Sequence, residues 1–365
     1  MAVGYDLNPA MVMVAKARLL SATVNPSHNT LCENILRTAD MRESDDVREE
    51  PLARWFSRKP ARYLRDLDWA IQRLLVSRDR YVSIPELSSL SQISSLAAFF
   101  YVALFRVVRH LTVKFGSSNP TWMKIPEAPQ RLRPSKSTIA SLFRGHVAAM
   151  AAAQWADGSR EVRSAKWPPV DSVTDIADST AVPEANGSTA AAICSPPYCT
   201  RIDYAIATRI ELAVLGFSDL RALRERMIGT AVIKQDVPKQ SELWGNTCNK
   251  FLDRLQNHTS KASKTYYLKN HLQYFASLFE SLAELDRVLC PNGQSIMVAQ
   301  DSYYKEIHND LPQVVREMGE NLGWSLIDKA DFVSNRHMGR VNPNTKSYRT
   351  SEAAIESVLH FRKSV

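Results

Sequence analysis

A serine, two prolines and a tyrosine, Ser195 to Tyr198, follow a run of small and apolar residues and offer an unusual set of chemical groups. Consecutive prolines hold the backbone φ angles at about −65°, so the Ser195 hydroxyl and the Pro196 carbonyl would be two fixed hydrogen-bond acceptors. Such a pair suits an exocyclic amine of a nucleobase, whose lone pair is delocalised into the ring until acceptors hold its hydrogens and the nitrogen can pyramidalise. The Tyr198 ring offers a face on which a flipped base can stack. We call Ser195 to Tyr198 the hook.

The hook stands between two elements of different kinds. The run from 190 to 194 is typical of a buried strand, and residues from about 203 to 215 have the pattern of an amphipathic helix. This order predicts that the hook lies at the carboxyl edge of a parallel sheet, where open α/β folds bind ligands. Asp203 and Tyr204 would then line a base pocket, although capping and packing of the following helix is the commoner role. An ordinary strand-ending loop is the alternative interpretation of the hook.

Short apolar stretches alternate with helical patterns in the C-terminal half, which predicts an α/β fold. The predicted strands cover 173–176, 190–194, 294–300, 324–333 and 356–363, and the predicted helices cover about 203–215, 266–288 and 311–322. We expect a polar linker at about 235–262 and a turn at 291–293. At the N-terminus a very short strand ends at Asp6, and Asn8-Pro9 begins a helix.

Residues 51–165 form a helical region with a basic centre. Helices are predicted at 54–76, 91–113 and 137–155, with a loop at 116–137. Residues 101–150 hold eight Lys and Arg and one acidic residue, so most of the formal net charge of +8 lies there. Positive charge interleaved with aromatic rings, here Phe115, Trp122 and Phe143, is typical of a surface that contacts phosphates, with some stacking of these rings on bases. The candidates for nucleic-acid binding are Lys124, Arg131, Arg133, Lys136 and Arg144. A solvated basic face is the alternative.

The hexapeptide ICSPPY, with GYDLNP upstream and LDRVLCPNGQSIMVAQ downstream, resembles the amino methyltransferases that modify cytosine N4 or adenine N6 of DNA with S-adenosylmethionine. The resemblance covers about 1–40 and 170–365. It implies a Rossmann-like sheet of strand order 3-2-1-4-5-7-6, with Ser195, Pro196, Pro197 and Tyr198 as the catalytic tetrapeptide. A serine at the first position favours cytosine N4.

The same resemblance implies two cofactor-binding residues. Asp6 takes the position that binds the ribose hydroxyls, and Asp178 takes the polar position beside the adenine. Asp6 would otherwise be a helix cap, and Asp178 an ordinary turn aspartate. Residues 1–50 would supply the second and third strands of the cofactor-binding sheet, 51–165 would be an insertion carrying target recognition, and 166–365 would be the catalytic part.

Two parts of the family pattern are missing. The twelve glycines include no Gly-x-Gly sequence for the loop beside the cofactor, and the chain opens at the second strand. The first strand would lie between the second and the fourth, so its absence would leave several backbone groups unpaired at about 1–3 kcal/mol each. We expect a partner protein to supply this strand and its glycine loop; a truncated start is the alternative. An RNA methyltransferase and a non-catalytic nucleic-acid-binding subunit are the alternative functions.

Composition excludes several other classes. None of the five cysteines forms a Cys-x-x-Cys pair or follows a proline, so neither a structural zinc site nor the nucleophile of cytosine-C5 methylation is indicated, and we expect no metal. The apolar run from 96 to 105 is about half the length of a membrane span and is followed by Arg106, so we expect a buried helix. No secretory signal is visible, and a cytoplasmic location is expected.

Overall fold

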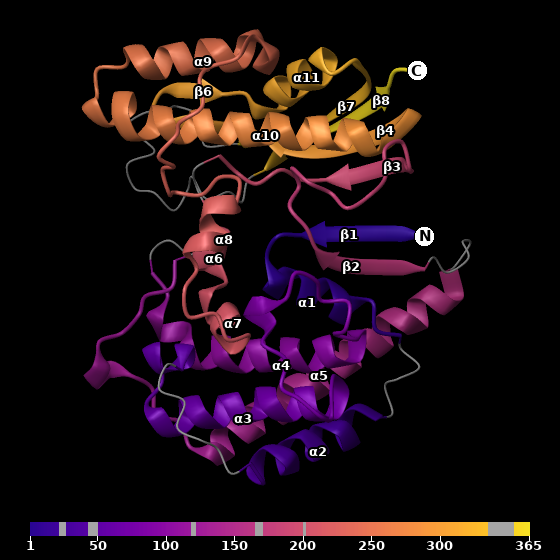
Figure 1. The fold of residues 1–365 in the computed structure, drawn as a ribbon, viewed down its shortest axis with the longest axis vertical. Helices are drawn as coiled ribbons and strands as arrows, with labels where there is room; N and C mark the ends of the chain where they lie inside the picture. The colour runs from indigo at the N-terminus through magenta and orange to yellow at the C-terminus, as the bar shows by residue number, and fades with distance from the viewer. Residues whose placement is uncertain (22–26, 43–49, 118–121, 165–170, 200–201, 335–353) are drawn as a thin grey trace. The chain divides into compact units, whose positions relative to one another are not determined.

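A computed structural model describes residues 1–21, 27–42, 50–117, 122–164, 171–199, 202–334 and 354–365 (Figure 1). The chain divides into two compact units, and each is described by itself. The first unit comprises Met1–Ile176 and Ala205–Arg221, and the second comprises Ala177–Tyr204 and Ala222–Val365. Both units combine helices with β-sheet, so the prediction of an α/β fold is confirmed.

The first unit has a two-stranded parallel sheet, in which β1 (Ala2–Asp6) pairs with β2 (Ser172–Ile176). After β1, helix α1 (Pro9–Arg18) begins as its sequence predicts, with Pro9 in the first turn and the Asn8 side chain accepting a hydrogen bond from the Ala10 N–H. We expected the third strand of the sheet within residues 1–50. The described residues of that range form one strand, and the neighbour of β1 comes from beyond the helical region, because strand pairing depends on contacts far apart in the sequence.

Four further helices build most of the first unit. They are α2 (His28–Asp40), α3 (Arg58–Leu75), α4 (Ser95–Thr112) and α5 (Lys136–Ser164). The range 95–115 is apolar and long enough to cross a membrane, but 61% of its most apolar window is buried inside the structure, as in the core helix of a soluble protein. Aromatic rings pack tightly around α4: His28 stacks on Phe99 with ring centroids 4.4 Å apart. The ranges 1–50 and 51–165, which we expected as separate regions, fall in one unit.

A buried arginine joins the helical region to the segment that follows the hook. Arg65 on α3 donates to the carbonyl oxygens of Ala213 and Val214 at 2.8 and 2.7 Å, and it is paired with Glu50 at 2.9 Å and Asp68 at 2.8 Å. The two carbonyls belong to the C-terminal end of α7 (Arg209–Val214), where a helix leaves carbonyl groups without partners. The guanidinium therefore satisfies the end of α7 and fixes it within the first unit.

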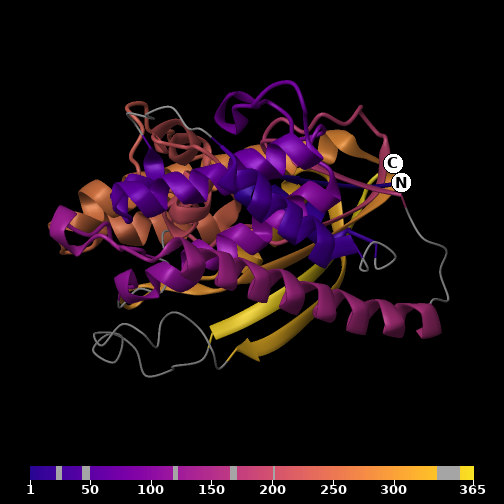
Figure 2. The ribbon, with the colours of Figure 1, turned by 90° about the horizontal axis from the view of Figure 1, so that it is seen from below.

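The second unit is a four-stranded mixed sheet of order β3-β4-β8-β7. Strand β3 (Thr189–Cys194) runs parallel to β4 (Leu289–Gln300), whereas β8 (Ala354–Lys363) is antiparallel to both β4 and β7 (Trp324–Ser334). Figure 2 shows β7 and β8 as long neighbouring arrows. A small hairpin, β5 (Ser302–Tyr304) with β6 (Ile307–Asn309), follows β4.

Three helices supply the core of the second unit: α9 (Gly245–Asn257), α10 (Leu268–Val288) and α11 (Leu311–Asn321). Their apolar sides form one buried cluster with β4 and β8, in which the ring of Phe275 on α10 lies edge-on to Phe251 of α9 with ring centroids 6.1 Å apart. The strands predicted at 190–194, 324–333 and 356–363 and the helices predicted at 266–288 and 311–322 are present. Three other predictions differ from the structure.

The first difference is α9, a helix of 13 residues in the middle of the range 235–262 that we expected to be a polar linker. Its buried residues Cys248, Phe251, Leu252 and Leu255 have helical spacing, but polar residues around them masked it. The expected turn at 291–293 is part of β4, where Asn292 has a φ of +62° and the pairing with β3 shifts register. The helix expected at 203–215 is two short helices, α6 (Tyr204–Ala207) and α7.

Candidate functional site

The hook directly follows β3, at the carboxyl end of a strand that is parallel to β4. The Ser195 hydroxyl donates a hydrogen bond to the Val298 carbonyl of β4 at 3.1 Å. Since the hydroxyl hydrogen is used in this bond, the oxygen lone pairs are left to accept. Ser195 is exposed, and Pro196, Pro197 and Tyr198 are half-buried, so the acceptors can be reached from solvent.

The back of the hook is held by two residues that sequence reasoning did not find. The Tyr274 hydroxyl donates to the Pro197 carbonyl at 2.7 Å, and the Tyr274 side chain is 1% exposed. Gly229, at a φ of +77°, lies against the Tyr198 carbonyl, and a Cβ atom there would be 2.8 Å from that oxygen. No sequence motif marks either residue, because both contacts join segments that are far apart in the chain.

The two acidic candidates of the second unit both contact α8 (Arg221–Arg226). Asp203 is buried and its carboxylate is 2.8 Å from Arg224, whereas Asp178 is 3.3 Å from Arg226. Asp178 also accepts from the Thr180 N–H at 3.1 Å and thereby closes a turn. The structure therefore brings these two carboxylates to one short helix. Tyr204 begins α6 next to Asp203 and is half-buried.

Asp6, the candidate for the cofactor ribose, ends β1 in the first unit. Its carboxylate accepts a hydrogen bond from the Asn8 N–H at 2.7 Å, and the residue as a whole is exposed. The carboxyl itself is partly desolvated by the chain around it, which raises its pKa, and the Asn8 N–H lowers the pKa by a smaller amount. The residue thus closes the turn before α1 at the carboxyl end of a parallel strand.

The five basic candidates of the first unit differ in what surrounds them. Lys136 is 2.7 Å from Asp40, and Arg144 is 2.6 Å from Glu33, so these two charges are partly neutralised within the chain. The guanidinium–carboxylate contact lowers the pKa of Glu33. Lys124 and Arg133 are exposed and form no ion pair with another described residue, while Arg131 is half-buried.

The aromatic rings of this basic region are less available than we expected. Phe143 is fully buried and Phe115 is 9% exposed, so neither can stack on a base. Trp122 is 42% exposed, and the Arg209 guanidinium lies 5.6 Å from its ring centroid. The expectation of several stacking aromatics is therefore wrong for the two phenylalanines, which the sequence pattern of the core helices could have identified.

The strand before the hook, β3, has one edge without a described neighbour and an exposed apolar side chain. Within the described residues β3 has one sheet neighbour, β4, and β1 has one, β2, so β1 and β3 belong to separate sheets. Ile193 of β3 is 78% exposed although its strand is entirely small and apolar apart from Thr189. An apolar strand of an α/β sheet is ordinarily covered. Among the described residues no three His, Cys, Asp or Glu side chains gather to hold a metal ion.

Comparison of the chain with protein-family models, with curated protein sequences and with solved structures gives no match.

Proposed function

We propose that the chain is the catalytic part of an S-adenosylmethionine-dependent methyltransferase that modifies an exocyclic amine of a flipped DNA base, with cytosine N4 favoured over adenine N6. The observation that carries the proposal is the hydrogen bond from the Ser195 hydroxyl to the Val298 carbonyl. Because this bond uses the hydroxyl hydrogen, the serine oxygen can only accept a further hydrogen bond. Ser195 is exposed and lies at the carboxyl end of a parallel strand. An amine needs an acceptor in that position.

The strand orders support a Rossmann-like methyltransferase sheet. The pair β2-β1 would correspond to strands 3-2 of the order 3-2-1-4-5-7-6, and β3-β4-β8-β7 would correspond to strands 4-5-7-6. In this correspondence β8 would be strand 7, and it is antiparallel to both of its neighbours. No strand of the described residues would correspond to strand 1.

In the proposed mechanism the hook prepares the amine before the methyl group is transferred. The two amine hydrogens donate to Ser195 Oγ and to the Pro196 carbonyl, which localises the nitrogen lone pair. S-adenosylmethionine, when bound, would supply a methyl group on a sulfonium, and the sulfur would keep the electron pair of the broken S–C bond as a neutral thioether. The Tyr198 ring would stack on the base and orient the nitrogen. The product nitrogen is cationic once its bond to carbon has formed, and it then loses a proton to water, so the hook needs no strong base.

The acidic candidates fit the cofactor unequally. Asp6 is exposed, and its carboxylate would hold the ribose hydroxyls. Asp178 already contacts Arg226 and Thr180, so it would have to release Arg226 before it could hold the adenine amine. Asp203 is likewise occupied by Arg224, and this favours a supporting role for it behind the base pocket.

A partner protein completes the proposed enzyme. The edge of β3 that has no described neighbour would accept a parallel strand from another polypeptide, which would also bring a glycine-rich loop, since the sequence holds no Gly-x-Gly. The exposed Ile193 side chain would be covered in the completed enzyme. A purified chain should then bind S-adenosylmethionine weakly in a calorimeter. Micromolar affinity without a partner would contradict this part of the proposal.

The test of catalysis uses the complex that is purified from native cells through a tag on this chain. Methyl transfer to plasmid DNA should fall about 100-fold or more in kcat for Ser195→Ala, because one acceptor is lost. Ser188→Ala is the matched control, since Ser188 also donates to a backbone carbonyl, that of Ala185 at 2.7 Å, but precedes β3. Activity of Ser195→Ala within twofold of the wild type would overturn the proposal.

The same preparation separates the alternative functions. Methyl transfer to RNA but not to DNA would assign an RNA substrate, and nucleic-acid binding without any transfer would indicate a non-catalytic subunit. Mass analysis of the product nucleosides would distinguish cytosine from adenine.

A further inference from the structure

We infer that Tyr274 is a positioning residue for the hook: its buried hydroxyl fixes the Pro197 carbonyl, which leaves the Pro196 carbonyl and Ser195 Oγ as the acceptors for the substrate amine. The catalytic meaning of this inference rests on the proposed function. Its structural content, that α10 sets the conformation of the hook, does not.

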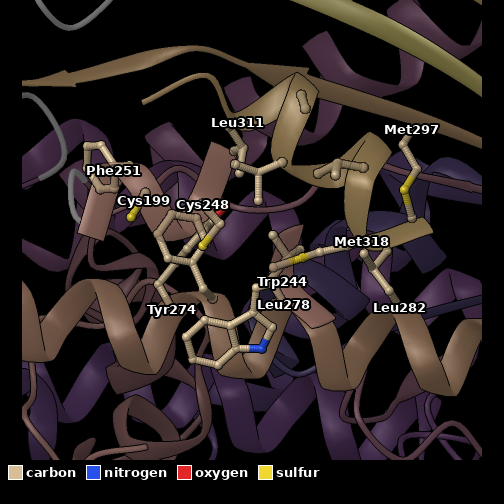
Figure 3. Close-up of a cluster of buried hydrophobic side chains, with 14 of the residues drawn as sticks. Cys199, Trp244, Cys248, Phe251, Tyr274, Leu278, Leu282, Met297, Leu311 and Met318 are labelled. Carbon is tan, nitrogen blue, oxygen red and sulfur yellow. The ribbon is translucent and has the colours of Figure 1, made fainter. Parts of the chain in front are cut away.

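The hydrogen bond that carries the inference has one possible direction. A carbonyl oxygen only accepts, so the Tyr274 hydroxyl is the donor to Pro197 across 2.7 Å. The ring lies in the apolar cluster of the second unit, beside Cys199 and Cys248 (Figure 3). Burial raises the pKa of Tyr274 well above its ordinary value of 10.0. The hydroxyl therefore keeps its proton, and remains a donor, at neutral pH.

The bond acts on the backbone freedom that the prolines leave open. Each proline ring fixes φ. The ψ angle of Pro196 is restricted as well, because a proline follows it, whereas the ψ angle of Pro197 can rotate and sets the direction of the Pro197 carbonyl. The Tyr274 hydroxyl fixes this direction for Pro197. The Pro196 carbonyl has no hydrogen bond to another described residue, so of these two carbonyls it is the one available to a substrate.

The same face of α10 holds a second support of the hook. Asn270 donates to the Thr230 carbonyl at 2.7 Å, and Gln273 donates to the Val232 carbonyl at 3.0 Å while accepting from the Lys234 N–H at 2.7 Å. These bonds fix the segment that begins at Gly229, whose backbone touches the Tyr198 carbonyl. One helix thus holds the hook both directly and through this segment.

The test is Tyr274→Phe, which removes the hydroxyl and keeps the ring. The rate of alkylation of each cysteine is measured by peptide mass spectrometry. Cys199, which is 2% exposed, directly follows the hook and reports on it. Cys248 is fully buried in the same core and serves as the internal reference. We expect Cys199 to react about fivefold faster in the variant, the change that corresponds to one lost hydrogen bond, and Cys248 to be unchanged. Tyr304→Phe is the control, since it removes a tyrosine hydroxyl that contacts the Ser263 hydroxyl at 2.9 Å, away from the hook and from the segment that begins at Gly229.

Unchanged protection of Cys199 in Tyr274→Phe would overturn the inference. If Cys248 also became reactive, the core itself would have loosened, and the carbonyl ¹³C shifts of selectively labelled prolines in the wild-type protein would then decide. A Pro197 carbonyl that shows no hydrogen-bonded shift relative to Pro196 would also overturn it. Neither readout requires activity.

In an active complex, Tyr274→Phe should lower kcat about tenfold and leave KM for S-adenosylmethionine within twofold. A wild type without methyl transfer would contradict the proposed function alone.

Discussion

Gly229 is the residue at which the backbone requirement of the hook is sharpest. Its φ of +77° is in the left-handed region, and the space where a Cβ would lie is occupied by the Tyr198 carbonyl oxygen at 2.8 Å. Both facts disfavour any residue other than glycine. Gly145 on α5 is the opposite case, because it is exposed and a Cβ there would meet no atom within 4 Å.

We expect Gly229→Ala and Gly145→Ala to change stability in opposite directions. The first should lower the free energy of unfolding by about 1–3 kcal/mol through backbone strain. The second should raise it by about 0.5–1 kcal/mol, because alanine restricts the unfolded chain and favours helix. Urea denaturation of both variants measures the difference. Equal stability of Gly229→Ala and the wild type would show that the loop can move away from the Tyr198 carbonyl.

For single residues, the sequence indicates the candidate residues of the hook better than the residues that hold the hook in place. Ser195 and the two prolines are recognisable because their chemistry is local to four residues. Tyr274 is 76 residues from Tyr198 in the printed sequence, and its hydroxyl finds Pro197 only after α10 has packed. Asp203 and Asp178 were found from local context, but their arginine partners on α8 were not, because ion pairs depend on tertiary arrangement.

The elements of the second unit show where local patterns predict well and where they fail. Strands β3, β7 and β8 are identifiable from apolar runs, whereas α9 lies in a range that is polar on average. Its buried face is defined by four residues, and the burial of Cys248 and Phe251 depends on α10 and α11. The first residues of β4 were not predicted as strand because Pro291-Asn292-Gly293 favours a turn. The structure accommodates this tripeptide as a bulge within β4.

A titratable pair links β6 to the start of β8. His308 lies 3.0 Å from Asp301, which also accepts from the Ile355 N–H at 2.8 Å. The hydrogen bond to Asp301 raises the pKa of His308 above 6.5; burial and Arg254 oppose this, and the charges of Asp301 and Asp310 add to it. Because the folded-state pKa is the higher one, the stabilisation is fully present below pH 6.5 and is lost as the pH rises through the folded-state value.

We therefore expect the free energy of unfolding to decrease between about pH 6 and about pH 8, with His308 contributing less than about 1 kcal/mol because its side chain is 40% exposed. His308→Gln should lose this contribution and flatten the profile. Urea denaturation at several pH values gives the measurement, and His360→Gln is the control, because His360 contacts the neutral Gln294. A His308→Gln profile parallel to the wild type would assign the pH dependence to other groups.

For the whole molecule, the strand pairings matter more than the strands themselves. The sequence indicated each of the strands around the hook, but it could not predict that β2, rather than a strand within 1–50, would be the neighbour of β1. Pairing is decided by contacts across more than 160 residues of the printed sequence. Among the described residues β1 and β3 belong to different sheets, so one edge of β3 has no described strand beside it.

The charge of the molecule leads to a prediction about nucleic-acid binding. Four of the basic candidates fall into two pairs. Lys124 and Arg133 are exposed and have no carboxylate partner among the described residues. Lys136 contacts Asp40, and Arg144 contacts Glu33. Each phosphate contact contributes about 0.9 to the slope of log K against log salt concentration. A cation that must first release a carboxylate gains less from meeting a phosphate.

Replacing Lys124 and Arg133 together by Ala should therefore reduce this slope by nearly two for a short DNA duplex, and replacing Lys136 and Arg144 should reduce it by about half as much or less. Fluorescence anisotropy at several salt concentrations measures both, and an unchanged melting temperature of the first pair shows that the fold is intact. Equal losses for the two pairs would mean that Asp40 and Glu33 do not compete with DNA. No loss for either pair would exclude these four cations as DNA contacts. The next basic element to test would be α8, whose Arg224 and Arg226 contact Asp203 and Asp178.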